Sequence, residues 1–362
     1  MSEIYNFNAG PAILPRPVLE QAQQELLDYQ GRGMSIMEMS HRSKEYEAIN
    51  GNAEAGFKRL LGLEGDAYRV LFLQGGASTQ FAMVPLNFLP AGAVADYLVT
   101  GAWAEKALEE AGKLGQARAA ASTSEGGYRR MPSQAEIRLS ESPAYIHITS
   151  NETIQGTQWH AWPDVGERPL VADMSSDILS RPLDAGHFAL IYAGAQKNLG
   201  PAGVTVVLVR QEWLGSAAKR VPAMLSYATH AKNSSLYNTP PVFAVYMLGL
   251  VLEWIEECGG LAAIGERNRH KAATIYAAID QSGGFYRGHA EADSRSLMNV
   301  TFRLPSEDLE KRFVAEAAAA GMVGLAGHRS VGGIRASIYN AMSQAGCAAL
   351  AEFMGVFARK NG

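Results

Sequence analysis

The sequence predicts an α/β protein with a mainly parallel β-sheet covered by helices on both faces, followed by a smaller α/β domain. Two observations support this prediction. Short, continuous apolar runs alternate with segments whose apolar residues have helical spacing, as expected for buried parallel strands and the helices that cover them. After Gly259-Gly260 the pattern changes to long helices separated by few short strands, which indicates a second domain.

The first domain is expected to span residues 16–258. Its predicted helices are 15–29, 43–61, a segment through Met83 and Leu86, and 104–111. Its predicted strands are 68–73, 94–99, 145–148, 170–173, 188–192 and 204–209. Residues 112–142 hold many serines, glycines and arginines, so they predict mostly loop without defined elements.

The second domain is expected to span residues 259–362, with the N-terminal segment 1–15 packed near it. A long helix that follows Pro240-Pro241 is predicted to end at Cys258, because helices often end at glycine and two glycines follow. The elements predicted beyond it are a helix over 262–279, a strand over 298–304, a helix over 307–320, a short strand pair near 333–338, and a last helix through Leu350, Phe353, Met354 and Phe357.

The composition excludes several function classes. The 362 residues are 47% hydrophobic and 19% charged with a formal net charge of −4, so neither nucleic acid nor an anionic membrane is an expected partner. Two cysteines, Cys258 and Cys347, are too few for a disulfide framework or a four-cysteine zinc site, and no metal is expected. We find neither a secretory signal nor an apolar run long enough to span a bilayer, so a cytoplasmic protein is expected.

Lys197 lies in the segment YAGAQKNLGPAGV, residues 192–204, between two predicted buried strands. An amine held in such a bend is partly removed from water, which lowers its pKa and makes the neutral, nucleophilic form accessible. This placement suits a lysine that forms a Schiff base. The alternative is an ordinary lysine in a surface turn, and the segment by itself does not decide between them.

Three further candidates follow predicted strands. Residues 74–79, QGGAST, combine glycines with a helix start, which suits a phosphate; a serine helix cap is the alternative. Asp173 ends a buried strand, where a carboxylate needs a partner such as a cationic ring nitrogen, a helix end or Arg181. Trp103 either forms a flat wall against an aromatic ligand or packs in the core.

Cationic residues gather in two places in this acidic chain. One is the pair His41-Arg42, and the other is the segment GHRSVGGIR, with His328, Arg329 and Arg335. Arginine binds carboxylate and phosphate in bidentate fashion, so these clusters predict an anion pocket. Solvated surface arginines are the alternative, although Arg335 lies in a strand-like stretch where burial without a partner would be costly.

Taken in order, these segments resemble the pyridoxal-phosphate-dependent aminotransferases of fold type I and class V, and within them the branch that acts on phosphoserine. The resemblance covers nearly the whole chain. The segments that carry it are FNAGPAILP at 7–15, MSHRSKEYE at 39–47, FLQGGASTQF at 72–81, SNETIQGT at 150–157, VADMSSDILSRP at 171–182, IYAGAQKNLGPAGV at 191–204, YNTPPVFAVY at 237–246 and GHRSVGGIRASIYNA at 327–341. It implies a seven-stranded, mainly parallel sheet in the large domain and pyridoxal 5'-phosphate as cofactor.

The resemblance also implies roles around the cofactor. Lys197 is the implied Schiff-base lysine and proton carrier, Asp173 the partner of the pyridinium nitrogen, and Trp103 the residue stacked on the ring. Thr153 is the implied partner of the phenolic oxygen. The implied contacts of the cofactor phosphate are Ala77, Ser78 and Gln196, together with Asn238 and Thr239 from the partner subunit of a homodimer.

For the substrate, the resemblance implies a phosphate pocket and a carboxylate contact. The implied phosphate pocket consists of His41, Arg42, His328 and Arg329. Arg335 is the implied partner of the α-carboxylate. Some relatives carry an arginine where this chain has Ser78, so here more of the phosphate binding is expected from the pocket residues.

The implied reaction is reversible transamination between O-phospho-L-serine and 2-oxoglutarate, giving 3-phosphohydroxypyruvate and L-glutamate in serine biosynthesis. The related 4-phosphohydroxy-L-threonine of pyridoxine biosynthesis is an expected second substrate. One alternative is a fold type I relative such as a cysteine desulfurase, which needs a reactive cysteine near the cofactor. The other is a non-catalytic phosphate- or nucleotide-binding α/β protein, which would leave Lys197, Asp173 and Trp103 unexplained as a set.

Overall fold

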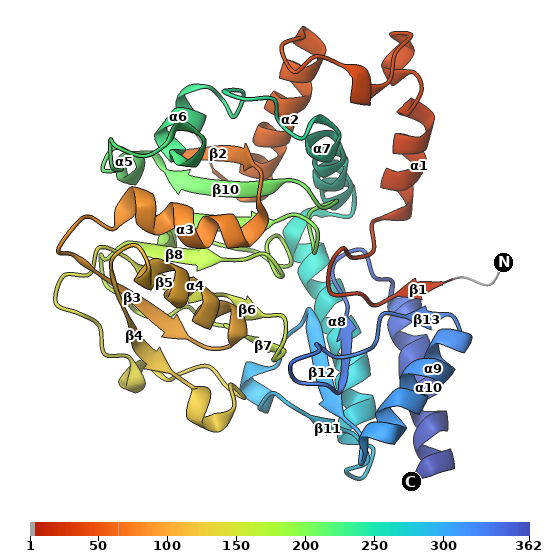
Figure 1. The fold of residues 1–362 in the computed structure, drawn as a ribbon. Helices are drawn as coiled ribbons and strands as arrows, with labels where there is room; N and C mark the ends of the chain where they lie inside the picture. Colours follow the sequence, from red (N-terminus) through yellow and green to blue (C-terminus); the bar gives the residue numbers. More distant parts are fainter. Residues whose placement is uncertain (1–3, 64) are drawn as a thin grey trace.

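The central feature of the molecule is a seven-stranded sheet, seen in a computed structural model that describes residues 4–63 and 65–362 (Figure 1). The strand order is β2-β10-β9-β8-β5-β3-β4, and only β10 runs antiparallel to its two neighbours. Its strands are β2 (Tyr68–Leu73), β3 (Val94–Val99), β4 (Gln116–Ser122), β5 (Ile146–Thr149), β8 (Leu170–Asp173), β9 (Leu190–Gly194) and β10 (Thr205–Arg210). The predicted fold class is confirmed.

Helices cover both faces of this sheet because its strands are apolar on both sides. In β2, Val70 and Phe72 face one core cluster with helices α2 and α7, whereas Leu71 and Leu73 face another with α3 and α4. The helices of this part are α1 (Arg16–Glu25), α2 (Lys44–Leu60), α3 (Gly76–Phe88), α4 (Ala102–Gly112), α5 (Gln211–Leu214), α6 (Tyr227–Lys232) and α7 (Val242–Glu257). None of the helices in the described residues is both long and apolar enough to cross a membrane.

The C-terminal part packs around a third core cluster, which joins Phe7 to apolar residues between 272 and 357. Its elements are α8 (Gly260–Asp280), β11 (Arg287–Gly288), β12 (Asn299–Arg303), α9 (Glu307–Ala319), β13 (Met322–Val323), β14 (Ile334–Ser337) and α10 (Gln344–Asn361). Strand β1 (Tyr5–Asn6) pairs with β13. Residues 1–3 of the predicted N-terminal segment lie outside the described residues, and the boundary between 258 and 259 stays a prediction.

Two sequence expectations were wrong. Residues 116–122, expected as loop, form the edge strand β4, whose side chains are mostly exposed and therefore lack an apolar pattern. The strand pair expected near 333–338 is the single strand β14, which pairs with β12 and is bridged to Ala326.

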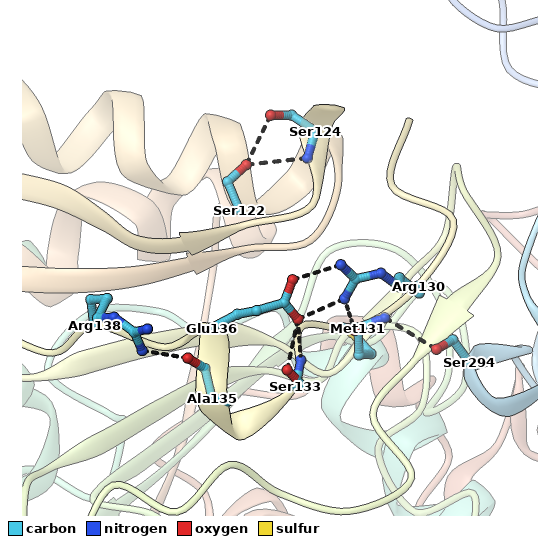
Figure 2. A network of polar contacts seen from close by, with 9 residues as sticks. All are labelled: Ser122, Ser124, Arg130, Met131, Ser133, Ala135, Glu136, Arg138 and Ser294. Carbon is cyan, nitrogen blue, oxygen red and sulfur yellow. Dashed lines mark hydrogen bonds and ion pairs between the residues drawn. The ribbon is translucent and has the colours of Figure 1, made fainter. Parts of the chain in front are cut away.

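The segment after β4 is held by polar contacts rather than by regular elements (Figure 2). Glu136 accepts two bonds from the Arg130 guanidinium, at 2.8 and 2.6 Å, and caps the short helix that begins after Ser133. The Met131 amide donates to Ser294 Oγ in the C-terminal part at 3.1 Å.

The remaining elements are short. The 3₁₀ helices are η1 (Tyr29–Gly31), η2 (Ile36–Glu38), η3 (Ser124–Gly126), η4 (Gln134–Glu136), η5 (Ala185–His187), η6 (Ala223–Leu225) and η7 (Ala292–Ser294). The short β6 (Asn151–Glu152) and β7 (Thr157–Gln158) pair with each other.

Candidate active site

A cavity of about 360 Å³ opens at the carboxyl ends of the parallel strands, where ligands bind in open α/β sheets. Loops after β2, β3, β8 and β9 form one wall, and the C-terminal part supplies the other. The sequence-predicted residues that line the cavity are Ala77, Ser78, Trp103, Thr153, Asp173, Gln196, Lys197, His328 and Arg335. Residues far apart in the sequence thus meet at one place.

Lys197 lies in the connection between β9 and β10 and points at Thr153. Its Nζ donates to Thr153 Oγ1 at 2.5 Å, and its side chain is mostly buried. Burial lowers the pKa of Lys197 to about 8, and the nearby carboxylates of Asp173 and Glu152 oppose that shift. Gly10 passes close by, since a Cβ there would lie 3.3 Å from Lys197 Cγ. The amine is therefore held in place and is partly neutral near pH 8.

Asp173 is the last residue of β8 and is buried. Its Oδ1 accepts from the backbone N–H of Ser175 at 2.9 Å. Burial raises the pKa of Asp173, and the positive charge of Lys197 counteracts this effect. Arg181, the alternative partner, instead donates to the carbonyl of Trp159, and no ion pair between Asp173 and Arg181 occurs in the described part. The carboxylate is thus available to a cationic ligand in the cavity.

Trp103 lies in the first turn of α4, directly after β3. The centre of its ring is 5.3 Å from Lys197 Nζ and 4.5 Å from Lys106 Nζ. Its indole Nε1 is buried and has no hydrogen-bond partner among the described residues. The ring therefore forms a flat wall beside the amine, as the aromatic-ligand interpretation requires.

The loop between β2 and α3 has the geometry of an anion cradle. Gly75 and Gly76 adopt φ of +94° and +65°, and a Cβ on Gly75 would lie 2.0 Å from Thr79 Oγ1. The N-cap of α3 is Gly75, so no capping side chain accepts from the first N–H groups of the helix, which include those of Ala77 and Ser78. Free amides at a helix N-terminus suit a phosphate.

His328 and Arg335 line the opposite wall. Burial lowers the pKa of Arg335, and its Nε is buried without a partner among the described residues. Burial, together with the positive charges of Arg335, Arg329 and Lys106, lowers the pKa of His328. A buried cation without an anionic partner favours a bound anion.

The remaining predicted residues do not line this cavity. Arg329 is exposed and lines a neighbouring cleft. On the loop before α2, Arg42 is exposed and His41 is half-buried. On the loop before α7, both Asn238 and Thr239 are exposed. The carbonyl of Thr239 accepts from Gln74 Nε2 at 3.2 Å, which holds this loop beside the glycine loop.

Sequence reasoning missed Glu152 and Ser175. Glu152 is completely buried and bonds to the start of α4, while Ser175 bonds Asp173 and lines the cavity. Burial raises the pKa of Glu152 to about 7. Both residues lie within conspicuous segments, SNETIQGT and VADMSSDILSRP, but a buried carboxylate has no sequence signal of its own.

The comparisons with known proteins agree in one family. The aminotransferase class-V model matches residues 4–350. This chain belongs to the class-V aminotransferases. A phosphoserine aminotransferase from Herpetosiphon aurantiacus is 65% identical over 359 residues, 99% of each chain. The structure of the phosphoserine aminotransferase from Bacillus circulans subsp. alkalophilus has a TM-score of 0.98 at 58% identity and covers all of both chains.

A third relative bears on the cofactor. The pyridoxal-phosphate-bound phosphoserine aminotransferase from Trichomonas vaginalis is 37% identical, with a TM-score of 0.93, over 98% of this chain and all of that chain. This chain is therefore a fold type I aminotransferase that depends on pyridoxal phosphate. The site fits that cofactor, because it offers a lysine amine, a buried carboxylate, an aromatic wall and free helix amides.

The cysteine desulfurase alternative lacks its nucleophile. Cys258 is the last residue before the glycine stop of α7, and Cys347 is buried in α10. Burial raises the pKa of the Cys347 thiol to about 12. Neither cysteine lines the cavity.

Proposed function

We propose that this aminotransferase catalyses the reversible exchange of an amino group between O-phospho-L-serine and 2-oxoglutarate, giving 3-phosphohydroxypyruvate and L-glutamate in serine biosynthesis. The observation that carries the proposal is full-length similarity, at 55–65% identity, to relatives named phosphoserine aminotransferase. The larger phosphohydroxythreonine of pyridoxine biosynthesis shares the same phosphate and amino acid groups, so we propose it as a second substrate.

For the cofactor, we propose that Lys197 holds the aldehyde carbon through its amine. Asp173 would pair with the ring nitrogen, Thr153 with the phenolic oxygen and Trp103 with the ring face. The residues proposed to bind its phosphate within one chain are Ala77, Ser78 and Gln196. Pyridoxal phosphate, when bound, supplies an electron-withdrawing ring that accepts the electron pair of the substrate α-carbon.

The chain's own residues are proposed to bind and orient the substrate and to move its α-proton. Arg335 would bind the α-carboxylate, which orients the Cα–H bond toward Lys197. The released Lys197 amine, with its pKa lowered to about 8, is suited to take the α-proton and later return it. His328 and Arg329 would bind the phosphate of the substrate together with His41 and Arg42.

An amino-donor screen at fixed 2-oxoglutarate tests the substrate assignment. We expect phosphoserine to have a kcat/KM at least about 100-fold above that of serine, because a phosphate held by paired cations contributes several charge-assisted bonds. Phosphohydroxythreonine should be used as well. Equal kcat/KM values for serine and phosphoserine would contradict the phosphate pocket.

We further propose a homodimer that shares its active sites. Three of the predicted site residues are exposed and lie outside the cavity of their own chain: Arg42, Asn238 and Thr239. We propose that these residues, together with His41, complete the active site of the second copy. Large apolar side chains close to these residues in sequence are exposed, Met37 by 59% and Tyr237 by 50%, and an interface would cover them. The two unpaired cysteines fit a reducing compartment, and we propose the cytoplasm.

Mixed dimers test the shared site. Lys197→Ala and Arg42→Ala proteins are unfolded, mixed and refolded together, and activity is assayed at phosphoserine concentrations below the wild-type KM, where the raised KM expected for Arg42→Ala lowers its rate. We expect partial recovery of activity, because one of the two sites in a hybrid dimer then contains both wild-type residues. Absence of recovery in a mixture shown by sedimentation to contain dimers would place Arg42 and Lys197 of one chain in the same site.

A further inference from the structure

Glu152 is a buried carboxylate that no step of the proposed reaction uses. It ends β6 and lies between the start of α4 and Thr153, whose hydroxyl contacts Lys197. Its side chain is completely buried. An ionisable group in such a position is costly unless the surrounding groups satisfy both of its oxygens.

Both oxygens are satisfied by the helix that carries Trp103. The backbone N–H of Trp103 donates to Glu152 Oε2 at 3.1 Å, and that of Ala104 donates to Oε1 at 3.0 Å. The N-cap of α4 is Gly101, which supplies no capping side chain. Glu152 therefore provides from 48 positions away the cap that a local Ser or Asp usually provides.

The absence of a side chain at Gly101 makes room for this contact. A Cβ on Gly101 would lie 2.4 Å from the Glu152 carboxylate carbon. The φ of Gly101 is 168°, which any residue can adopt, so the requirement is for space rather than for backbone freedom. The start of α4 is thus shaped around this one carboxylate.

The turn that carries Glu152 is fixed from the other side by the C-terminal part. Thr301 Oγ1 donates to the carbonyl of Gln155 at 2.7 Å, and the amide of Ser296 donates to the carbonyl of Gly156 at 2.9 Å. Two adjacent residues of this fixed segment hold two different parts of the site. Glu152 accepts a hydrogen bond from the Trp103 amide, and Thr153 accepts one from the Lys197 amine.

We propose that Glu152 is a positioning residue that sets the Trp103 ring over the cofactor by holding the Trp103 and Ala104 amides. A carboxylate suits this task better than an amide, because it offers two acceptor oxygens and a negative charge at a helix N-terminus. A glutamine would turn an N–H₂ group toward one of the two backbone N–H groups and leave that donor unpaired. The inference rests on the proposed contact between Trp103 and the cofactor ring.

The test uses holoenzyme of the wild type, Glu152→Gln and Glu152→Ala. The control is Ser306→Ala, which removes the Ser306 Oγ that caps α9 at the Leu309 amide, in the C-terminal part and outside the active-site cavity. Two readouts other than turnover are measured. The visible circular dichroism of the bound cofactor reports how the ring is held. The second readout is the rate of cofactor dissociation, measured in a buffer that traps the released cofactor so that it does not rebind. Thermal midpoints are recorded for all proteins.

We expect Glu152→Gln to change the visible dichroism and to speed dissociation roughly tenfold, the effect of one lost hydrogen bond at the ring's support. Ser306→Ala should lower only the thermal midpoint. Unchanged dichroism and an unchanged dissociation rate in Glu152→Gln would overturn the proposal. Equal changes of both readouts in Ser306→Ala would overturn it as well. If Glu152→Ala does not fold, the isosteric Glu152→Gln variant alone provides the test. Borohydride reduction that attaches the cofactor covalently to Lys197→Ala as it does to the wild type would refute the proposed attachment instead, and the dissociation rates would still test the role of Glu152.

Discussion

The two walls of the active site are built differently. On the side of the sheet, Lys197, Asp173 and Thr153 are buried or nearly so, and each is bonded to a neighbour at the end of a strand. On the other side, His328 and Arg335 line the cavity, while Arg42 and Arg329 are exposed on loops outside it. The comparison indicates that one chain alone preorganises the wall proposed to hold the cofactor, whereas the proposed phosphate contacts would be completed by a second subunit or by bound substrate.

The largest expected effect is the loss of the amine on the sheet wall. Lys197→Ala should lower kcat about 10⁴-fold or more, since the proposed covalent attachment and proton transfer would disappear together. Borohydride reduction should attach the cofactor covalently to the wild type and not to this variant. Normal turnover would refute the proposed role, and Lys232→Ala, an exposed lysine in α6, is the control.

Replacement of the buried carboxylate comes next. Asp173→Asn should lower kcat about 10²- to 10³-fold, because the ring nitrogen would lose the carboxylate charge proposed to stabilise its cationic form. The matched control is Asp177→Asn, a buried carboxylate bonded by Gln158 at 2.9 Å that does not line the cavity. Equal losses of kcat in both variants at equal stability would show that Asp173 has no special role.

The pH dependence of stability tests how strongly the sheet wall removes Lys197 from water. Its folded-state pKa of about 8 lies below the ordinary 10.5, so folding favours the neutral amine. The stability of cofactor-free protein should therefore rise, relative to Lys197→Met, as the pH increases through 8 toward 10.5. Between pH 7 and 9.5 the difference in unfolding free energy should change by about 2 kcal/mol, measured with urea. Parallel profiles would indicate a solvated amine.

The smallest effect is expected at the proposed phosphate contacts outside the cavity. Arg42→Ala should raise the KM for phosphoserine about tenfold with little change in kcat, since the proposed phosphate contact would serve binding equally in the ground state and the transition state. The KM for 2-oxoglutarate, which carries no phosphate, provides an internal reference. Arg312→Ala, an exposed arginine in α9, serves as the control, and a fall in kcat at constant KM would move Arg42 to the chemical step.

The sheet could be predicted well because its buried strands are continuous apolar runs, whereas the edge strand β4 could not. In β4 only Ala120 and Ala121 are buried, so burial leaves almost no apolar pattern there. The alternatives left open for Asp173 also needed the structure: Arg181 turned out to bond Trp159, which residue spacing alone does not reveal.

By itself, the sequence determined the α/β fold, the glycine loop and the motif around Lys197, because strand burial, helix starts and tight turns depend on residues close together in the chain. Only the tertiary structure decided which groups meet. Thr153 bonds an amine 44 positions away, and Glu152 caps a helix that begins about 50 positions before it. Such contacts depend on the order of strands in the sheet, which brings their carboxyl ends to one edge and leaves no mark in local sequence.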